Sequence, residues 1–199
     1  MNEALLIVDV QYDFMPEGAL GVKGGDQIVP IINQIIGKIS LVIASQDWHP
    51  EGHVSFAVVH NKEVGESVDV HGKKQKLWPV HCVAHTHGAS LVKELNKGRI
   101  HKYVHKGVDK DIDSYSAFFD NDGVKSTGLD EFLRENKITK LYIAGLTTDF
   151  CVLYSALDAR ELGYEVAVIR DACKPVFDEK EPFQKMREAG VEIINASDL

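Results

Sequence analysis

Four short hydrophobic runs in the sequence are each followed by a residue type that can take part in catalysis. These residues are an aspartate, an aspartate–histidine pair, a lysine and a cysteine: Asp9, Asp47, His49, Lys106 and Cys151. If the runs are parallel strands, their carboxyl ends share one edge of a sheet, where ligands bind in folds of this type. A single polar residue at a strand end is more often a cap or a solvated group. A carboxylate, an ammonium and a thiol from separate strands together predict a reactive site.

Cys151 is the clearest candidate nucleophile. It lies in the segment Gly145-Leu-Thr-Thr-Asp-Phe-Cys151, which is typical of a turn from a strand into a helix. In the first turn of a helix, free N–H groups and the macrodipole lower a thiol pKa and can bind an oxyanion. The alternative is a small buried hydrophobic residue, which is the commoner role of a free cysteine. We assign that alternative to Cys82 and Cys173.

Asp47 and His49 indicate a divalent metal site. At the extended end of a strand, residues i and i+2 project to the same side, so both side chains can face one ion. The following loop offers several histidines as a further ligand, and their spacing does not choose among them: His53, His60, His71, His81, His85 and His87. A solvated, histidine-rich loop is the alternative interpretation.

The elements that must position these residues alternate along the chain. Hydrophobic runs predict six strands, over residues 4–9, 41–45, 100–104, 141–144, 165–169 and 191–194. Helices are predicted over residues 26–37, 127–136, 148–162 and 178–189. Strand–helix alternation predicts an α/β fold with three α/β/α layers around a central, mostly parallel six-stranded sheet. The sequence has neither repeat nor linker, so residues 1–199 are expected to form a single domain, with a long irregular loop from about 48 to 90.

The composition excludes several classes of function. The 199 residues carry 30 acidic and 22 basic side chains, a formal charge of −8, which argues against a nucleic-acid partner. The sequence lacks a membrane-length apolar run and a signal-peptide pattern, and its three cysteines do not suggest a disulfide framework. A cytoplasmic protein without membrane contact is therefore expected. Dinucleotide-binding, Walker A and G-x-S-x-G patterns are also missing.

Several motifs match a known family over nearly the whole chain. The chain resembles nicotinamidases (pyrazinamidases) of the isochorismatase-like cysteine hydrolase superfamily. The matching segments include Leu6-Ile-Val-Asp9-Val-Gln-Tyr-Asp-Phe14, Asp47-Trp-His49-Pro, Trp78-Pro-Val-His81, Lys106-Gly107, Asp113-Ser-Tyr115 and Gly145-Leu-Thr-Thr-Asp-Phe-Cys151. The charged stretch 61–76 departs from the family pattern, which leaves the geometry of that loop open.

The resemblance implies a role for each matched residue. It implies a catalytic triad of Asp9, Lys106 and Cys151. It implies an oxyanion hole from the backbone N–H groups of Thr147 and Cys151, with a cis peptide before Thr147 in many relatives. The implied metal ligands are Asp47, His49 and His81, while His53 matches a ligand in only some relatives. The aromatic residues implied around the substrate ring are Phe14, Trp78 and Tyr115.

The activity implied by the resemblance is hydrolysis of nicotinamide, and also of pyrazinamide, to the acid and ammonia through a cysteine thioester, as a step of NAD salvage. One divalent ion is implied, zinc first, with iron and manganese as alternatives. The oligomeric state stays open, with a homo-oligomer among the alternatives. Three other readings remain: a superfamily relative acting on another amide or on isochorismate, a metal–water hydrolase that does not need Cys151, and a non-catalytic binding protein.

Overall fold

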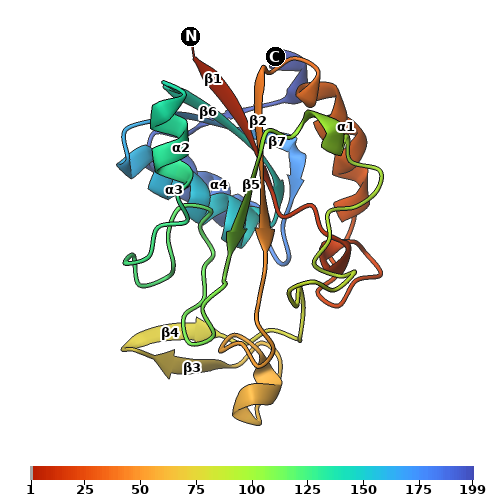
Figure 1. Ribbon diagram of the computed structural model, residues 1–199, viewed down its shortest axis with the longest axis vertical. Coiled ribbons are helices and arrows are strands. Elements are labelled where there is room, and N and C mark those ends of the chain that lie inside the picture. The colour runs from red at the N-terminus through yellow and green to blue at the C-terminus, as the bar shows by residue number, and fades with distance from the viewer. Residues whose placement is uncertain (1) are drawn as a thin grey trace.

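The computed structural model describes residues 2–199 and is organised around one six-stranded sheet (Figure 1). The strand order is β5-β2-β1-β6-β7-β8, and every neighbouring pair is parallel. The strands are β1 (Glu3–Val8), β2 (Leu41–Asp47), β5 (Lys102–Lys106), β6 (Lys140–Leu146), β7 (Glu165–Lys174) and β8 (Glu192–Ile194). From β1 the chain runs outward through β2 to β5 on one side, then crosses to β6 and runs outward through β7 to β8 on the other. The carboxyl edge near this reversal, between β1 and β6, is where α/β folds bind ligands.

Helices cover both faces of the sheet and complete the three predicted layers (Figure 1). One face is covered by α1 (Ile28–Ile36), whose buried side chains are Ile28, Val29, Ile32, Ile35 and Ile36. The opposite face is covered by three helices: α2 (Leu129–Glu135), α3 (Leu153–Glu161) and α4 (Lys180–Glu188). The α/β/α arrangement expected from the alternation of strand and helix patterns is thereby confirmed.

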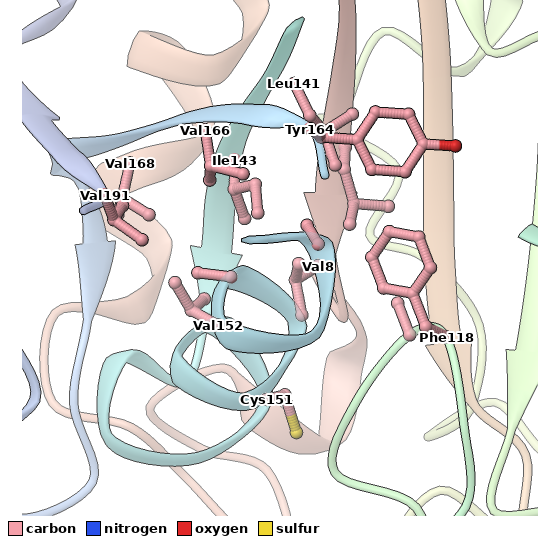
Figure 2. Packing of buried hydrophobic residues seen from close by; sticks show 14 of the residues in the cluster. Val8, Phe118, Leu141, Ile143, Cys151, Val152, Tyr164, Val166, Val168 and Val191 are labelled. Atoms are coloured by element: carbon pink, nitrogen blue, oxygen red, sulfur yellow. The ribbon is translucent and has the colours of Figure 1, made fainter. Parts of the chain in front are cut away.

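The central strand β1 shows why the sequence reads as a continuous apolar run. Its residues 4–8 are fully buried, and they alternate between two separate cores. Leu5 and Ile7 pack toward α1, whereas Leu6 and Val8 pack toward the other three helices. Figure 2 shows the second of these cores from close by. A strand buried on both faces has no polar alternation, which is typical of a parallel sheet.

Two predictions about the chain path need correction. Helix 148–162 does not begin as a regular α-helix, because residues Thr148–Val152 form a π-helical turn ahead of α3. The stretch 48–90 is not wholly irregular, because it contains an antiparallel hairpin of β3 (Ser67–Val70) and β4 (Lys73–Lys76). The alternation of polar and apolar residues in β3 spans only four positions, and β4 is wholly polar, so neither strand gives a clear signal. Figure 1 shows the hairpin beyond the carboxyl ends of β2 and β5.

Among residues 2–199 there is no helix with the length and hydrophobicity needed to cross a lipid bilayer.

Candidate active site

The polar residues singled out in the sequence converge at the carboxyl edge of the sheet. The register places Asp47 opposite Lys106, Ile7 opposite Ala44 and Val8 opposite Gly145, so the ends of β5, β2, β1 and β6 lie within about two residues of one another. Asp9 leaves β1 with a left-handed backbone, at a φ of 51°, and its N–H donates to the Ser45 carbonyl at 3.3 Å. This turn directs the Asp9 side chain toward the residues at the end of β2.

Lys106 is the centre of a buried charged cluster. Its Nζ lies 2.9 Å from Asp9 Oδ2 and 3.3 Å from Cys151 Sγ, and it also forms an ion pair with Asp47. The carbonyl of Ser114 accepts a further hydrogen bond from Nζ at 3.1 Å. Lys106 is 1% exposed. A cation this deeply buried is stable only with such partners, so the two carboxylates hold it in its charged form.

The two carboxylates of this cluster have opposite protonation tendencies. Burial raises the pKa of Asp9, with the ammonium of Lys106 opposing the rise. Burial also acts on Asp47, but the charge of Lys106 and contacts with His49 outweigh it and hold the Asp47 pKa well below its usual range. Burial likewise disfavours charged Lys106, yet Asp47 and Asp9 raise its pKa well above normal. Asp47 therefore stays ionised, while Asp9 is the better proton acceptor.

The two carboxylate oxygens of Asp9 have different partners. Its Oδ1 accepts a hydrogen bond from Ser45 Oγ at 2.7 Å, whereas Oδ2 faces the Lys106 ammonium, 2.9 Å from Nζ, and has no other polar partner among the described residues. Carboxylate oxygens of Asp9 and Asp47 and the sulfur of Cys151 all lie within 4.8 Å of one another. The Asp9 carboxylate and the Cys151 thiol therefore belong to one cluster around Lys106.

Cys151 occupies the π-helical turn and lines the cavity at the end of the sheet. Figure 2 shows its sulfur directed away from Val152 and the rest of the hydrophobic cluster. Burial raises the pKa of the Cys151 thiol well above its ordinary range, and the nearby Lys106 offsets only part of this effect. The expectation that the start of the helix lowers this pKa is therefore wrong for the free protein, because loss of water outweighs the favourable charge.

The other two cysteines lie in different surroundings. Cys82 and Cys173 are buried at 0% and 2% exposure, and neither is among the cavity-lining residues. Burial raises the pKa of Cys173 to about 12 and that of Cys82 well above normal. Both behave as small hydrophobic residues, as expected from the sequence.

Three of the candidate metal ligands form a compact set beside the charged cluster. Ligand atoms of Asp47, His49 and His81 lie within 4.8 Å of one another, and each histidine Nε2 is 3.7 Å from Asp47 Oδ2. His49 Nδ1 lies 2.9 Å from the Gly107 carbonyl, and His81 Nδ1 lies 2.8 Å from the Pro79 carbonyl. Because a carbonyl can only accept, each Nδ1 carries the proton and each Nε2 presents a lone pair toward the carboxylate. This donor set fits one divalent cation.

Gly107 is required for that arrangement. It adopts a φ of 62°, and a Cβ on it would lie 2.4 Å from His49 Cε1. Only glycine lets the backbone approach the imidazole closely enough for the hydrogen bond to Nδ1.

His53 belongs to the same histidine group without joining the compact set. Its ring stacks on His49 at 4.1 Å, and its Nδ1 pairs with Ser55 Oγ at 2.8 Å. Its buried Nε2 has no hydrogen-bond partner among residues 2–199, and one of its ring nitrogens lies within 4.8 Å of ligand atoms of His49 and Asp113. The remaining histidines of the loop make contacts elsewhere, with a backbone carbonyl, a half-buried aspartate and two aromatic rings: His60, His71, His85 and His87.

The cavity beside Cys151 is small and partly aromatic. About 20 Å³ is open to the centre of a water molecule, which is room for one or two waters. The three aromatic residues expected around the ring, Phe14, Trp78 and Tyr115, all line it. Thr147 lines it as well and follows a cis peptide bond after Leu146.

Sequence reasoning missed several members of the site. Further lining residues are Leu20, Asp113, Ser114, Phe150 and Val176. Phe150 directly precedes Cys151 and could have been found from that position, but Leu20 and Val176 lie on loops without any pattern. Gln11 was also missed. Its side chain bonds the backbone N–H and carbonyl of Asp47 at 2.9 and 2.8 Å and so fixes the end of β2.

The model of the isochorismatase domain matches residues 3–198. The chain belongs to the isochorismatase domain family. Within this family, it is 43% identical to a nicotinamidase from Escherichia coli over 98% of this chain and 95% of that one. The structure of a nicotinamidase/pyrazinamidase from Acinetobacter baumanii superposes with a TM-score of 0.96 at 41% identity, covering 99% and 97% of the two chains. A Pyrococcus horikoshii pyrazinamidase in complex with zinc gives a TM-score of 0.81 at 36% identity, covering 98% and 99%.

Proposed function

We propose that this protein is a nicotinamidase that hydrolyses nicotinamide, and also pyrazinamide, to the carboxylic acid and ammonia with Cys151 as nucleophile. The observation that carries this proposal is the position of the Cys151 thiol, within 4.8 Å of the Asp9 carboxylate and 3.3 Å from Lys106 Nζ, in a cavity with aromatic walls. The nicotinamidase relatives, aligned over nearly the full chain, support the choice of substrate.

In the first step the thiol attacks the amide carbon. Asp9 takes the thiol proton on a carboxylate oxygen, and the Cys151 sulfur forms a bond to the carbonyl carbon. The C–N bond then breaks as the same proton passes from Asp9 to the departing nitrogen, which leaves as ammonia. Because the free thiol is neutral, transfer to Asp9 and attack are coupled, and Lys106 stabilises the negative charge as it develops on sulfur.

The second step restores the enzyme. Asp9 removes a proton from water, whose oxygen attacks the thioester carbon, and the C–S bond breaks with return of a proton to sulfur. The carboxylic acid is released and Cys151 is again a thiol. In both steps the tetrahedral oxygen would be held by the backbone N–H groups of Thr147 and Cys151, and one such donor contributes about 3–4 kcal/mol to catalysis.

We propose that Asp47, His49 and His81 hold one divalent ion, with His53 as a neighbour of the site. The two Nε2 lone pairs and the ionised carboxylate fit zinc, which the Pyrococcus horikoshii pyrazinamidase contains, and they would also accept iron or manganese. When bound, the ion supplies a Lewis acid that can coordinate a ring nitrogen. The aromatic walls formed by Phe14, Trp78 and Tyr115 then restrict the ring to one plane.

A cytoplasmic location is part of the same proposal. All three cysteines are free thiols, and a catalytic thiol must stay reduced. This supports a reducing compartment, where nicotinamide released from NAD would be recycled.

The proposal is tested by measuring ammonia release from nicotinamide, pyrazinamide and benzamide with the purified protein. We expect rapid turnover of the first two and slow turnover of benzamide, which lacks the ring nitrogen. A covalent thioester would be detected by mass spectrometry after rapid acid quench. If the protein, with its metal restored, releases no ammonia from either nicotinamide or pyrazinamide, the proposed function is rejected.

A further inference from the structure

The walls of the Cys151 cavity differ in how readily they can move. The space beside Cys151 that is open to the centre of a water molecule is only about 20 Å³, so a bound pyridine ring would lie in close contact with the walls. Asp47 and Thr147 are buried walls at or directly after strand ends, where close packing resists displacement. Partly exposed walls are contributed by Leu20, Tyr115, Phe150 and Val176. Loops with few buried contacts open at the lowest free-energy cost, so the movable wall lies among these.

Next to Val176 lies an exposed phenylalanine with no role in the proposed chemistry. The side chain of Phe177 is 65% exposed, which is unusual for a residue of this size. Its ring stacks on Trp78 at 6.2 Å with an interplanar angle of 19°, and its centroid lies 6.2 Å from that of Phe150 in an edge contact. Both partners line the cavity, so Phe177 forms an outer layer over its aromatic wall.

A cation from a distant segment completes this outer layer. Lys76, on β4, places its Nζ 5.0 Å from the ring centre of Phe177 and 5.7 Å from that of Trp78. These distances are within the range of cation–π attraction. Trp78 is only 4% exposed beneath the two residues. The hairpin and the loop after β7 therefore meet above the pocket.

Asp149 fixes the loop that carries Phe177. Its two carboxylate oxygens accept hydrogen bonds from the backbone N–H groups of Val176 at 2.9 Å and Phe177 at 2.8 Å. Asp149 lies in the same π-helical turn as Cys151, two residues earlier in the chain. The position of the outer wall is thus tied directly to the turn that presents the nucleophile.

We propose that Phe177, held over the pocket by Asp149, is a specificity-determining residue that limits the size of the ring substituents the enzyme accepts. This role rests on the proposed amidase function. Phe177 packs against Trp78 and Phe150, which line the cavity, so it limits how far these two walls can yield to a ring substituent. Asp149 is a positioning residue, because it acts on the substrate only through the loop.

The first test compares kcat/KM for nicotinamide with kcat/KM for nicotinamides methylated at ring carbons 5 and 6. In Phe177→Ala we expect the kcat/KM for the methylated substrate, relative to that for nicotinamide, to rise by about tenfold for at least one methyl position. This is the effect of one methyl group in a tight pocket. Phe177→Tyr should retain the wild-type ratio. Tyr103→Ala, which removes a 44% exposed aromatic residue on β5, is the matched control and should leave the ratio unchanged.

Asp149→Asn tests the anchor. An amide has one acceptor oxygen, and its NH₂ group would face a backbone N–H, so one of the two loop contacts is lost. We expect the substrate ratio to shift in the same direction as in Phe177→Ala. A general loss of stability would lower both kcat/KM values together and leave the ratio unchanged, which would overturn the role of Asp149.

A second readout does not depend on activity. In a Trp48→Phe background Trp78 is the only tryptophan, and acrylamide quenching of its fluorescence reports exposure. Phe177→Ala should increase this quenching. An unchanged quenching constant, or an unchanged substrate ratio in an active enzyme, overturns the role of Phe177 alone. Failure of the wild-type protein to hydrolyse nicotinamide overturns the proposed function and the specificity role with it.

Discussion

The inner and outer parts of the active site are built on different principles. Asp9, Lys106 and Cys151 are at most 5% exposed and come from the ends or continuations of β1, β5 and β6. The outer wall, by contrast, consists of side chains on loops and on a two-stranded hairpin. Phe177 is 65% exposed there, and its loop is held by only two backbone hydrogen bonds to Asp149.

The difference shows where rigidity is needed. Proton transfer between Asp9 and Cys151 requires that their separation be held to within a few tenths of an ångström, which a packed sheet can do. A lightly packed segment can shift to accommodate a substituted ring, which a packed sheet cannot. We therefore expect inner-site substitutions to act mainly on kcat and outer-site substitutions on substrate preference.

The largest effect is expected for the nucleophile. Cys151→Ala removes the atom that forms the thioester, so kcat for nicotinamide should fall by at least about a thousandfold. Cys82→Ala and Cys173→Ala should keep most of the activity, because neither side chain lines the cavity. The measurement is ammonia release at saturating substrate. Retention of a tenth of the wild-type rate by Cys151→Ala would rule out the covalent mechanism.

The next largest effect is expected for the proton acceptor. Asp9→Asn preserves shape but cannot accept the thiol proton, so acylation should slow by about 10²–10⁴. Lys106→Met should also impair acylation severely, because two carboxylates then lack their cation. Pre-steady-state formation of the acyl-enzyme separates this effect from loss of substrate binding. Near-normal acylation in either variant would remove that residue from the mechanism.

A smaller effect, on both binding and stability, is expected at the metal ligands. His81→Ala, or treatment with a chelator, should lower nicotinamide turnover and reduce the ratio of nicotinamide turnover to benzamide turnover. Because an ion that binds only the folded state stabilises it, unfolding free energy should fall by about 2–4 kcal/mol. Metal content by mass spectrometry and the thermal midpoint check this independently of activity. His60→Ala is the control. Strong discrimination against benzamide in a metal-free protein would contradict the proposed role.

The smallest effect is expected where the hairpin supports the inner wall. Gln75 on β4 is buried and donates hydrogen bonds to Asp113 Oδ2 and to the Lys76 carbonyl, both at 2.8 Å. Gln75→Ala leaves these acceptors unpaired, which should cost about 1–3 kcal/mol in unfolding free energy and raise KM more than it lowers kcat. Gln184→Ala, on the exposed side of α4, should change neither quantity. A fall in kcat alone would place Gln75 in the inner site instead.

Much of the fold could be predicted from the sequence because its signals are local. The run from Ala4 to Val8 reads as a buried strand whatever lies around it, since five successive apolar residues need two hydrophobic faces. Six such strands alternating with helical patterns define the layers, and the carboxyl-edge rule then gathers Asp9, Asp47, Lys106 and Cys151. The hairpin 67–76 was not predicted because β4 is wholly polar and the period-2 pattern of β3 spans only four residues.

The sequence by itself thus determined which residues reach the catalytic edge, because strand polarity and residue type are encoded along the chain. Only the tertiary structure decided how they interact. Lys106 contacts Asp47 as well as Asp9, and it is His81 whose Nε2 lies 3.7 Å from Asp47, while His60 and His71 turn elsewhere. Burial also reversed the expected direction of the Cys151 pKa shift. These outcomes depend on distances and on the exclusion of water between segments far apart in the chain, and no local pattern records either.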